Sequence, residues 1–299
     1  MKWLLEVRGW TLEVGKRIVV TGATGFIGRA LTKRLLDDGV TVIAFVLPEP
    51  LQRSLVVDGA EIVDCDLRYA NDARRAVEAA SPDLVVHLAA VGVTDPFLPI
   101  HDALRGNLEA TINLIKAING ACKLIVTRTP TEYDSMNVYA ASKAAAWEFC
   151  KMFFRTQGSP ITAVMPFQVY GRGLSERSLL GAALKAARND ESFPTTSGEQ
   201  VRDWIYIDDV IEGIVATSRA QNVEGETIEL GTGAGTPVRD VVKKVFDLVG
   251  RGQPLIGVLP QRAGEVAQQI ANAERSEKLT GWRAKIGLDE GLKWMIRDE

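Results

Sequence analysis

Histidine and cysteine, on which many metal and redox sites depend, are scarce in this chain. Its 299 residues include two histidines and three cysteines. Cys65, Cys122 and Cys150 are far apart in the sequence and do not have the spacing of metal ligands. A histidine-based metal site is therefore not expected, and no metal is assigned. We predict that the three cysteines are buried, reduced thiols of a cytoplasmic protein.

Long apolar runs and an excess of charge of one sign are also lacking. No apolar stretch approaches the roughly 18 residues of a membrane-spanning helix, and charges within the first eight positions interrupt any signal peptide. The formal net charge is −3, so no overall positive field attracts nucleic acid or acidic lipid. The sequence predicts a soluble protein with no nucleic-acid or membrane partner. A hydrophobic content of 46% allows a large core.

Short apolar runs alternate with helical stretches in the first half of the chain. Strands are expected at residues 17–20, 41–46, 61–65, 84–88, 124–127 and 162–165, and helices at residues 26–37, 70–80, 103–118 and 139–156. Continuous apolar strands separated by helices are typical of a parallel sheet covered on both faces. The predicted fold class is α/β, a doubly wound parallel Rossmann sheet that binds ligands at the carboxyl ends of its strands.

A glycine pattern follows the first strand. Residues 19–28 read VVTGATGFIG, so Gly22, Gly25 and Gly28 have the spacing GxxGxxG, and a helix is expected from about Phe26. One glycine permits a tight turn, one lets the backbone approach a pyrophosphate, and one lets the helix pack closely on the strand. Free N–H groups at the helix start attract phosphate. Between a strand and a helix, this pattern predicts a dinucleotide site.

Tyr139 and Lys143 are four residues apart in a helical stretch, so their side chains are expected on one face of the helix. A phenol titrates near ~10, and it exchanges protons at neutral pH when a nearby cation stabilises the phenolate. Lys143 can supply that cation and lower the pKa of Tyr139. The pair predicts a tyrosine that passes a proton to or from a substrate oxygen.

With these motifs the chain resembles the extended short-chain dehydrogenase/reductases, specifically the NAD-dependent epimerase/dehydratase branch that acts on nucleotide sugars. The resemblance extends from about residue 16 to residue 296. Further matching segments are CDLR at 65–68, VVHLAA at 85–90, NLEATINL at 107–114, MPFQVYG at 165–171, RDWIYIDDV at 202–210, LGTG at 230–233 and RAGE at 262–265. The resemblance implies hydride transfer between a nicotinamide cofactor and a sugar carbon, coupled to proton transfer by tyrosine.

The resemblance also implies how the chain is divided. Residues 1–166 would form the dinucleotide-binding domain, with segments near 201–232 returning to it, and residues 167–299 would form mainly a smaller C-terminal substrate-binding lobe. The helices at 103–118 and 139–156 would meet those of a second subunit, so a homodimer is expected.

The same resemblance assigns residues to the site. The cofactor is expected to contact Gly22, Thr24, Gly25, Phe26, Ile27, Gly28, Asp66, Leu67, Leu88, Ala89, Ala90, Asn107, Thr127, Tyr139, Lys143 and Pro166. The catalytic residues are expected to be Tyr139, Lys143 and Thr129, and the nucleotide-sugar substrate is expected to contact Thr129, Gln168, Arg202 and Arg262.

Several of these residues have a second interpretation. Thr129 would hydrogen-bond the reacting oxygen, but Thr127 could take that role, and a threonine at this position could instead cap a turn. Asn107 would relay a proton or bend its helix, and a polar surface asparagine is the alternative. Surface salt bridges are the alternative for Arg202 and Arg262.

Three other polar residues are assigned structural roles. His87 is interpreted as a strand-end histidine with satisfied hydrogen bonds rather than a catalytic one. Asp208 and Asp209 are interpreted as the N-cap pair of a helix.

The end of the second strand bears on the choice of cofactor. An acidic side chain there accepts hydrogen bonds from the adenosine ribose of NAD and repels the 2′-phosphate of NADP. The chain has Val46 at this position, and Arg53 and Arg29 are available as phosphate partners. The cofactor is therefore expected to be NADP or NAD, with NADP slightly favoured.

The residues after Thr129 bear on the reaction. The family places Asp-Glu there in 4,6-dehydratases, whereas this chain has Pro130 and Thr131, which disfavours that reaction. Because exchangeable NADPH suits a reductase, we expect a 4-ketoreductase of a nucleotide-linked 4-keto-6-deoxyhexose. A 4-epimerase that holds NAD tightly is the alternative. A catalytically silent dinucleotide-binding regulator is a further alternative.

Overall fold

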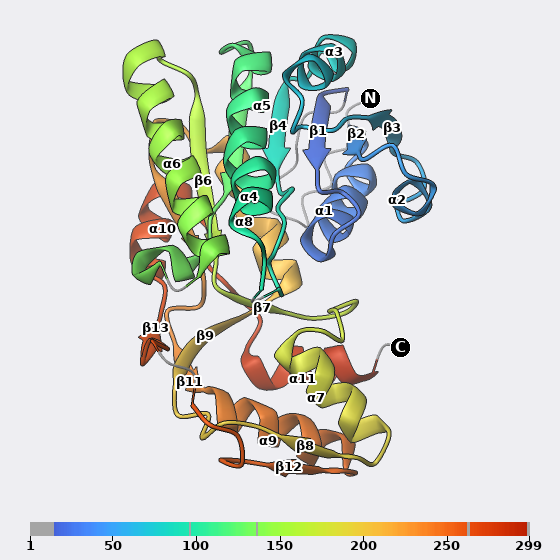
Figure 1. Cartoon of the computed structure of the whole chain (residues 1–299), viewed down its shortest axis with the longest axis vertical. Helices are drawn as coiled ribbons and strands as arrows, with labels where there is room; N and C mark the ends of the chain where they lie inside the picture. Colours follow the sequence, from blue (N-terminus) through green and yellow to red (C-terminus); the bar gives the residue numbers. More distant parts are fainter. Residues whose placement is uncertain (1–14, 96, 136, 262–263, 298–299) are drawn as a thin grey trace.

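Seven parallel strands form the central sheet of the molecule (Figure 1). The computed structural model describes residues 15–95, 97–135, 137–261 and 264–297. Across the sheet the strands are β3 (Glu61–Asp64), β2 (Thr41–Val46), β1 (Arg17–Thr21), β4 (Leu84–His87), β5 (Lys123–Thr127), β6 (Ile161–Pro166) and β10 (Thr227–Leu230). The chain winds outwards from β1 to β3 and then continues from β4 on the other side of β1. The predicted doubly wound sheet is confirmed.

Helices cover both faces of this sheet. They are α1 (Phe26–Asp37), α3 (Ala70–Ala80), α5 (Ala110–Ile118), α6 (Val138–Gln157) and α8 (Ile207–Arg219). The short helix α2 (Pro50–Ser54), after β2, has no buried residue. Successive residues of a strand point to opposite faces. Ile18 and Val20 of β1 accordingly share one core with residues of α1 and α8, whereas Val19 shares a second core with residues of α3, α5 and α6.

A smaller lobe lies beyond the carboxyl ends of the strands (Figure 1). Its elements are β7 (Gln168–Tyr170), α7 (Leu179–Arg188), β8 (Ser192–Pro194), β9 (Val201–Tyr206), β11 (Gly235–Pro237), α9 (Val238–Val249), β12 (Gln253–Leu255), β13 (Gln268–Gln269) and α11 (Leu288–Arg297). Strand β9 pairs with β7, β11 and β13, and β8 pairs with β12. The helix α10 (Ala273–Thr280) instead packs on β10 and α8.

One predicted helix differs from its expectation. The helix expected at 103–118 begins earlier, as α4 (Ile100–Ala103), and continues as a π-helix, η1 (Leu104–Glu109), before α5. Within this stretch Thr111 Oγ1 donates to Asn107 O at 2.7 Å, and the Asn107 side chain bonds the backbone of Val91. Such local polar contacts accompany a widened turn that hydrophobic periodicity does not predict. The other predicted elements of the first half agree with the structure to within one residue at each end.

The turn after β1 requires glycine at two positions. Gly22 has a φ of +69°, and a Cβ there would lie 2.7 Å from Ala89 N. A Cβ on Gly28 would lie 2.0 Å from Gly22 O. Gly25 N donates to Gly22 O at 3.0 Å and closes the turn. The turn and the start of α1 can approach one another this closely only without side chains.

A buried histidine links β1, β4 and α5. His87 is 1% exposed, and its Nδ1 lies 2.7 Å from Thr21 Oγ1 while its Nε2 lies 3.0 Å from Thr111 Oγ1. Both ring nitrogens have partners, so the interpretation of His87 as a satisfied strand-end histidine is confirmed. Burial, with the charge of Lys143 as the second cause, lowers the pKa of His87 to about 3.

The three cysteines are free and buried, as predicted. Burial raises the pKa of Cys122 to about 11 and the pKa values of Cys65 and Cys150 to about 12, so these thiols stay protonated at neutral pH. In the part of the chain that the structure describes, no helix combines the length and apolar character needed to cross a membrane. The same part holds no group of three histidine, cysteine or acidic side chains arranged for a metal ion.

Gly28→Ala is expected to destabilise the protein by about 3 kcal/mol, because the added methyl group would collide with the carbonyl of Gly22. Gly287→Ala is the matched control, since a Cβ at Gly287 would meet no atom within 4 Å. This control should cost under about 1 kcal/mol. Denaturant unfolding of both variants measures the difference. Equal stability of the two variants would contradict the close packing of the turn.

His87 should make the protein less stable at mildly acidic pH. Its pKa is about 3 in the folded protein and 6.5 ordinarily, so between these values the unfolded chain binds more protons. Its contribution to stability is therefore present above pH ~6.5 and is lost as the pH falls towards the folded pKa. From pH ~7.5 to ~5 the protein should lose about 2 kcal/mol more stability than His87→Gln. Urea unfolding at each pH measures the free energy of unfolding of both proteins. If this free energy changed equally with pH in the two proteins, the prediction would be wrong.

Candidate active site

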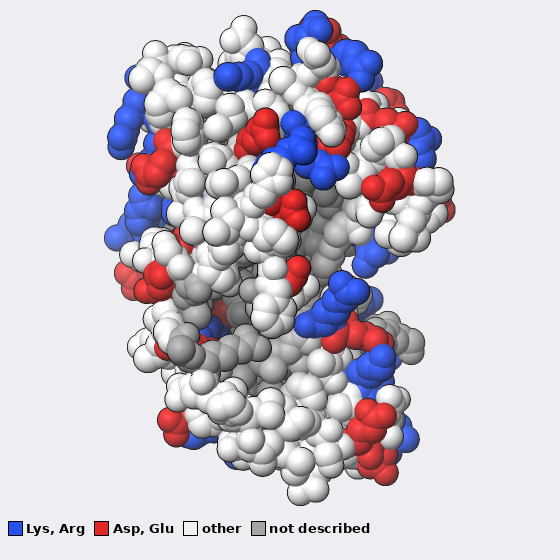
Figure 2. Space-filling model, in the orientation of Figure 1, with Lys and Arg blue, Asp and Glu red and all other residues white. Residues whose placement is uncertain are grey.

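The carboxyl ends of β1 and β4 mark the point where the chain changes direction across the sheet. β1 leads to β2 on one side and β4 leads to β5 on the other, so the loops that follow them diverge and leave a crevice between them. The glycine turn follows β1 and residues 88–90 follow β4, where Ala89 N donates to Thr21 Oγ1 at 3.2 Å. Figure 2 shows one face of the molecule hollowed between the part with the sheet and the smaller lobe.

The residues of the glycine turn fit the pyrophosphate of a dinucleotide. The Cβ positions of Gly22 and Gly28 are filled by neighbouring backbone atoms, so the loop is compact and bare of side chains at these points. Gly25 is the N-cap of α1, and the N–H groups of Phe26 and Ile27 belong to the first turn of that helix. Backbone N–H groups at a helix start are the standard ligands of phosphate.

The first turns of α6 carry Tyr139 and Lys143. The side-chain oxygen of Asn137 accepts the N–H of Ala140 at 2.8 Å, which caps α6 and fixes the turn that holds Tyr139. Tyr139 is partly buried, and Lys143, one turn later, is 5% exposed. Both residues belong to α6 and are four positions apart, so they lie on adjacent turns of one helix, as predicted.

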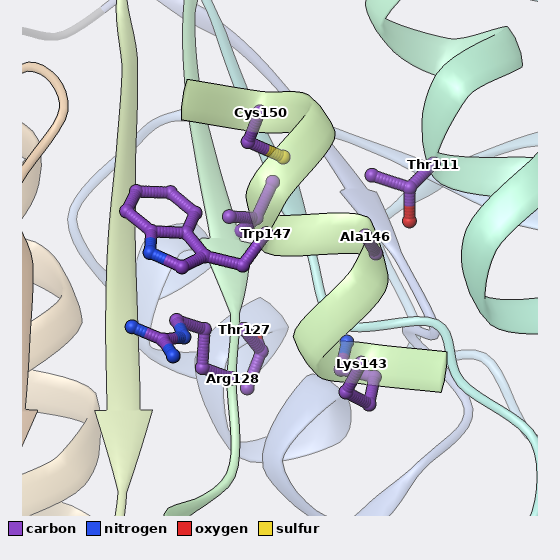
Figure 3. A pocket seen from close by; sticks show the side chains of 8 residues that line it. Thr111, Thr127, Arg128, Lys143, Ala146, Trp147 and Cys150 are labelled. Atoms are coloured by element: carbon purple, nitrogen blue, oxygen red, sulfur yellow. The ribbon is translucent and has the colours of Figure 1, made fainter. Parts of the chain in front are cut away.

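A cavity separates α6 from the end of β5 (Figure 3). The residues that line it with Lys143 include Thr111, Thr127, Arg128, Trp147 and Cys150. In Figure 3 Thr127 and Arg128, at the end of β5, lie beside the turns of α6 that carry Lys143 and Trp147, and Thr111 projects from the neighbouring helix α5. The charge of Lys143 also contributes, after burial, to the lowered pKa of His87 at the end of β4.

Burial controls the charge states of this pair. The pKa of Lys143 is lowered by burial, and the negative charge of Glu132 opposes that change. The pKa of Tyr139 is raised, first by burial and second by the charge of Glu132. The expected lowering of the pKa of Tyr139 by Lys143 is therefore not found in this structure. The physical reason is that removal from water penalises the phenolate and the ammonium alike.

The two threonines after β5 have different partners. Thr127 Oγ1 donates to His87 O at 3.1 Å. Thr129 is the N-cap of the short 3-10 helix η2 (Pro130–Asp134), because its hydroxyl accepts the N–H of Glu132. The carboxylate of Glu132 accepts the N–H of Thr129 in return, at 2.9 Å. The turn-capping interpretation of Thr129 is confirmed, and this cap holds its hydroxyl in a defined position.

A buried ion pair adjoins this cap, and sequence reasoning did not identify it. Arg128 Nε donates to Glu132 Oε2 at 2.8 Å, and the two side chains are 14% and 1% exposed. Arg128 Nη1 also donates to Thr227 Oγ1 at 2.8 Å, and the guanidinium lies 5.1 Å from the ring centroid of Trp147. The sequence signal was present, since residues 129–132 have the T-x-x-E pattern of a capping box.

Asn107 is buried in η1 and links three segments. Its Oδ1 accepts the N–H of Val91 at 2.8 Å, and its Nδ2 donates to Val91 O at 3.1 Å and to Ser142 Oγ at 3.0 Å. The interpretation of Asn107 as a surface residue is therefore wrong, and its place in the π-helix agrees with the helix-bending one. Asn107 fixes the loop after Ala90 relative to α6.

Two pairs of arginine and carboxylate lie at the ends of β2 and β3. Asp64 pairs in register with Val46, and its carboxylate accepts a hydrogen bond from Arg53. The carboxylate of Asp66 accepts hydrogen bonds from the backbone and side chain of Arg68, and these bonds lower the pKa of Asp66. This edge of the site therefore combines arginine with carboxylates, although Val46 itself is apolar.

Other residues assigned to the cofactor lie around these elements. Thr24 Oγ1 donates to Gln52 Oε1 at 2.8 Å, and Asn113 Nδ2 donates to Leu67 O at 2.9 Å. Leu67 is itself buried in the core with α3 and α5. Pro166 ends β6 beside Leu230. Gln52 and Asn113 are contacts that the sequence did not predict.

Two of the residues assigned to the substrate, Gln168 and Arg202, lie on the lobe. Gln168 is exposed on β7. Arg202 on β9 is 8% exposed, donates to Val266 O at 3.0 Å and lies 3.5 Å from Glu265 Oε1. The alternative of a surface salt bridge is therefore wrong for Arg202, because the pair is buried. Arg262 lies outside the described residues.

Two aspartates hold loops of the lobe through backbone N–H groups. Asp203, which is fully buried, accepts hydrogen bonds from the N–H groups of Thr232, Gly233 and Ala271. Asp209 accepts the N–H groups of residues 285 and 286. The predicted N-cap role of Asp209 is wrong, because the N-cap residue of α8 is Tyr206 and the carboxylate points to another segment.

Comparisons with known proteins agree with this arrangement. The model of the NAD dependent epimerase/dehydratase family matches residues 18–231. A UDP-glucose 4-epimerase of Cyamopsis tetragonoloba is 27% identical, over 95% of this chain and 94% of its own length. The structure of a UDP-glucose 4-epimerase of Thermotoga maritima, with UDP-glucose, has a TM-score of 0.86 at 23% identity and covers 93% of this chain and 97% of its own.

A second solved structure contains a cofactor. The UDP-glucuronic acid 4-epimerase of Bacillus cereus, in complex with UDP-glucuronic acid and NAD, has a TM-score of 0.81 at 24% identity, covering 93% of this chain and 97% of its own. The family match covers well over half of the chain, and its relatives are NAD-dependent enzymes. A catalytically silent regulator is therefore not retained. The chain belongs to the NAD-dependent epimerase/dehydratase family and is a nucleotide-sugar enzyme of the extended short-chain dehydrogenase/reductase type.

Proposed function

We propose that this enzyme reduces the 4-keto group of a nucleotide-linked hexose, with Tyr139 as the proton donor. The observation that carries the proposal is the placement of Tyr139 in the first turn of α6, one turn before the buried Lys143. Burial and the charge of Glu132 raise the pKa of this phenol, so it keeps its proton at neutral pH. A protonated phenol can donate to a ketone oxygen, whereas the oxidation of an alcohol needs a base at that position.

The other residues of the site would hold the reactants. The glycine turn would bind the pyrophosphate through Gly22, Thr24, Gly25, Phe26, Ile27 and Gly28. Lys143 would bind the nicotinamide ribose, and the residues around that ribose would be Leu88, Ala89, Ala90, Thr127 and Pro166. Asp66 and Leu67 would contact the adenine. Asn107 would position the loop that follows Ala90. When bound, the reduced nicotinamide supplies a hydride to carbon 4 of the sugar. Tyr139 then gives its proton to the oxygen, which Thr129 orients, and the ketone becomes an alcohol.

The smaller lobe would bind the nucleotide sugar. We place residues 1–166, with segments near 201–232, in the cofactor domain and residues 167–299 mainly in the substrate lobe. Gln168, Arg202 and Arg262 would contact the substrate, and a guanidinium fork suits a diphosphate. The exposed Phe149 and Met152 on α6 support a homodimer through the helices of this face. We place the enzyme in the cytoplasm.

The cofactor we propose is NADP in preference to NAD. The support is the apolar Val46 at the end of β2, where a carboxylate would repel a 2′-phosphate. Arg53 lies beside this strand end, paired with Asp64, and its side chain is 51% exposed. A guanidinium of this exposure can exchange its carboxylate partner for a phosphate.

A 4-epimerase that holds NAD tightly is the second candidate. The observation that favours it is the activity named for the relatives from Cyamopsis tetragonoloba and Thermotoga maritima. The two candidates differ in cofactor release, since a reductase consumes reduced cofactor and an epimerase returns the hydride to the same sugar.

Incubation with a dTDP- or CDP-4-keto-6-deoxyhexose and NADPH should therefore consume the absorbance of the reduced nicotinamide. Interconversion of UDP-glucose and UDP-galactose without such consumption would support the epimerase instead.

Tyr139→Phe should lower kcat at least ~10³-fold, because the proton donor is lost, while cofactor affinity changes less than about threefold. Tyr69→Phe, an exposed tyrosine, is the control and should retain activity. A fully active Tyr139→Phe would remove Tyr139 from the mechanism.

Arg53→Ala should weaken NADPH binding about tenfold and leave NADH binding within about twofold, because only NADPH carries the 2′-phosphate. Arg74→Ala is the control, since Arg74 pairs with Glu78 on the outer surface of α3. Fluorescence titration of both cofactors measures the affinities. If Arg53→Ala weakened the two cofactors equally, the preference would not come from this side chain.

A further inference from the structure

We propose that Glu132 is a positioning residue of the active site, which fixes Thr129 so that the threonine hydroxyl donates a hydrogen bond to the reacting substrate oxygen. This inference rests on the proposed function, in which Thr129 orients that oxygen beside Tyr139. Glu132 would act through Thr129 and would not itself touch the substrate.

Glu132 holds Thr129 through a reciprocal capping box. Its carboxylate Oε1 accepts the N–H of Thr129 at 2.9 Å. Its own N–H is directed at Thr129, bonding the hydroxyl and also the carbonyl oxygen at 3.1 Å. The hydroxyl, the amide and the carbonyl of one residue are thus all fixed by another residue three positions later. Thr129 therefore has little freedom to rotate.

These bonds also decide what the hydroxyl can do. A hydroxyl has one proton to donate and two lone pairs to accept with. The capping box directs the N–H of Glu132 at a lone pair of Thr129 Oγ1. Thr131 Oγ1 lies 3.0 Å from the same oxygen, and either hydroxyl can be the donor of that hydrogen bond. An accepted hydrogen bond strengthens the bond that the same hydroxyl donates. When Thr131 is the donor of this pair, both lone pairs of Thr129 Oγ1 are occupied and its proton is left for a substrate oxygen.

Arg128 keeps the Glu132 carboxylate in place. A carboxylate whose side chain is 1% exposed is stable only when its charge is paired. Arg128 supplies the charge through the bond from its Nε, and it is anchored in turn by Thr227 of β10 and by the ring of Trp147 on α6. Figure 3 shows the guanidinium of Arg128 beside the Trp147 ring at the edge of the cavity that Lys143 lines. The cap is therefore connected, through Arg128, to both β10 and α6.

Glu132 is also close to the catalytic pair. Its charge contributes to the raised pKa of Tyr139 and opposes the lowering of the pKa of Lys143. Both effects require that the carboxylate lie near α6. They agree with the packing of η2 against the first turns of that helix.

Two substitutions of Glu132 separate the effect of its side-chain length from the effect of its negative charge. Glu132→Asp keeps the charge next to Arg128, but its shorter side chain cannot reach the N–H of Thr129, so kcat should fall at least ~10-fold with KM within about threefold. Glu132→Gln keeps an acceptor of the original length and should recover at least a third of the wild-type kcat. Circular dichroism and cofactor titration check that both variants fold and bind nicotinamide dinucleotide.

The same comparison in a Thr129→Val background tests whether Glu132 acts through the hydroxyl. With that hydroxyl gone, Glu132→Asp should change kcat less than about twofold, whereas a general structural role would lower kcat as much as before. A Glu132→Gln variant as slow as Glu132→Asp, wild-type kcat in Glu132→Asp, or an equal loss in both backgrounds would each overturn the inference. Absence of any turnover by the wild-type enzyme would instead overturn the proposed function on which it rests.

Discussion

The burial of Lys143 between α6 and the ends of β4 and β5 is the constraint on which the rest of the site depends. Removing an ammonium from water is costly unless it gains hydrogen bonds or nearby negative charge. Glu132 supplies charge, and among the described residues none hydrogen-bonds the ammonium. The ammonium is thus available to the hydroxyl groups of a bound ribose, and the glycine turn lies at the adjacent strand end, where a dinucleotide pyrophosphate would reach it.

Buried carboxylates that accept backbone N–H groups recur around this site. Asp203 holds the turn after β10, Asp209 holds the segment before α11, and Glu132 holds the turn after β5. All three segments are irregular, so their N–H groups have no partners from a helix or a sheet ladder. The carboxylates replace those partners, and in doing so they fix the loops between the sheet and the lobe in one arrangement. Charged side chains thereby do structural work near a site that needs precise loop positions.

The sheet and its helices could be predicted from sequence because their signals are local. The apolar runs of β1 and β4 and the glycines after β1 suffice, since periodicity and backbone freedom decide these elements. The π-helix around Asn107 and the partners of Asp209 depend on contacts between distant segments, and no local pattern contains them. The T-x-x-E pattern at residues 129–132 signals the cap, but the burial of Arg128 and Glu132 against β10 and α6 depends on tertiary packing. The charge state of Tyr139 was missed for a related reason, because the spacing to Lys143 is visible in the sequence but the burial of both groups is not.

The amine of Lys143 is expected to bind the cofactor beside Tyr139. Titration of the wild-type protein and of Lys143→Met with reduced nicotinamide dinucleotides, followed by nicotinamide fluorescence, tests it most directly. We expect one cofactor bound per chain, with affinity at least ~10-fold weaker in Lys143→Met, since hydrogen bonds to a charged group are lost. Equal affinities for the two proteins, or no binding by the wild type, would contradict it.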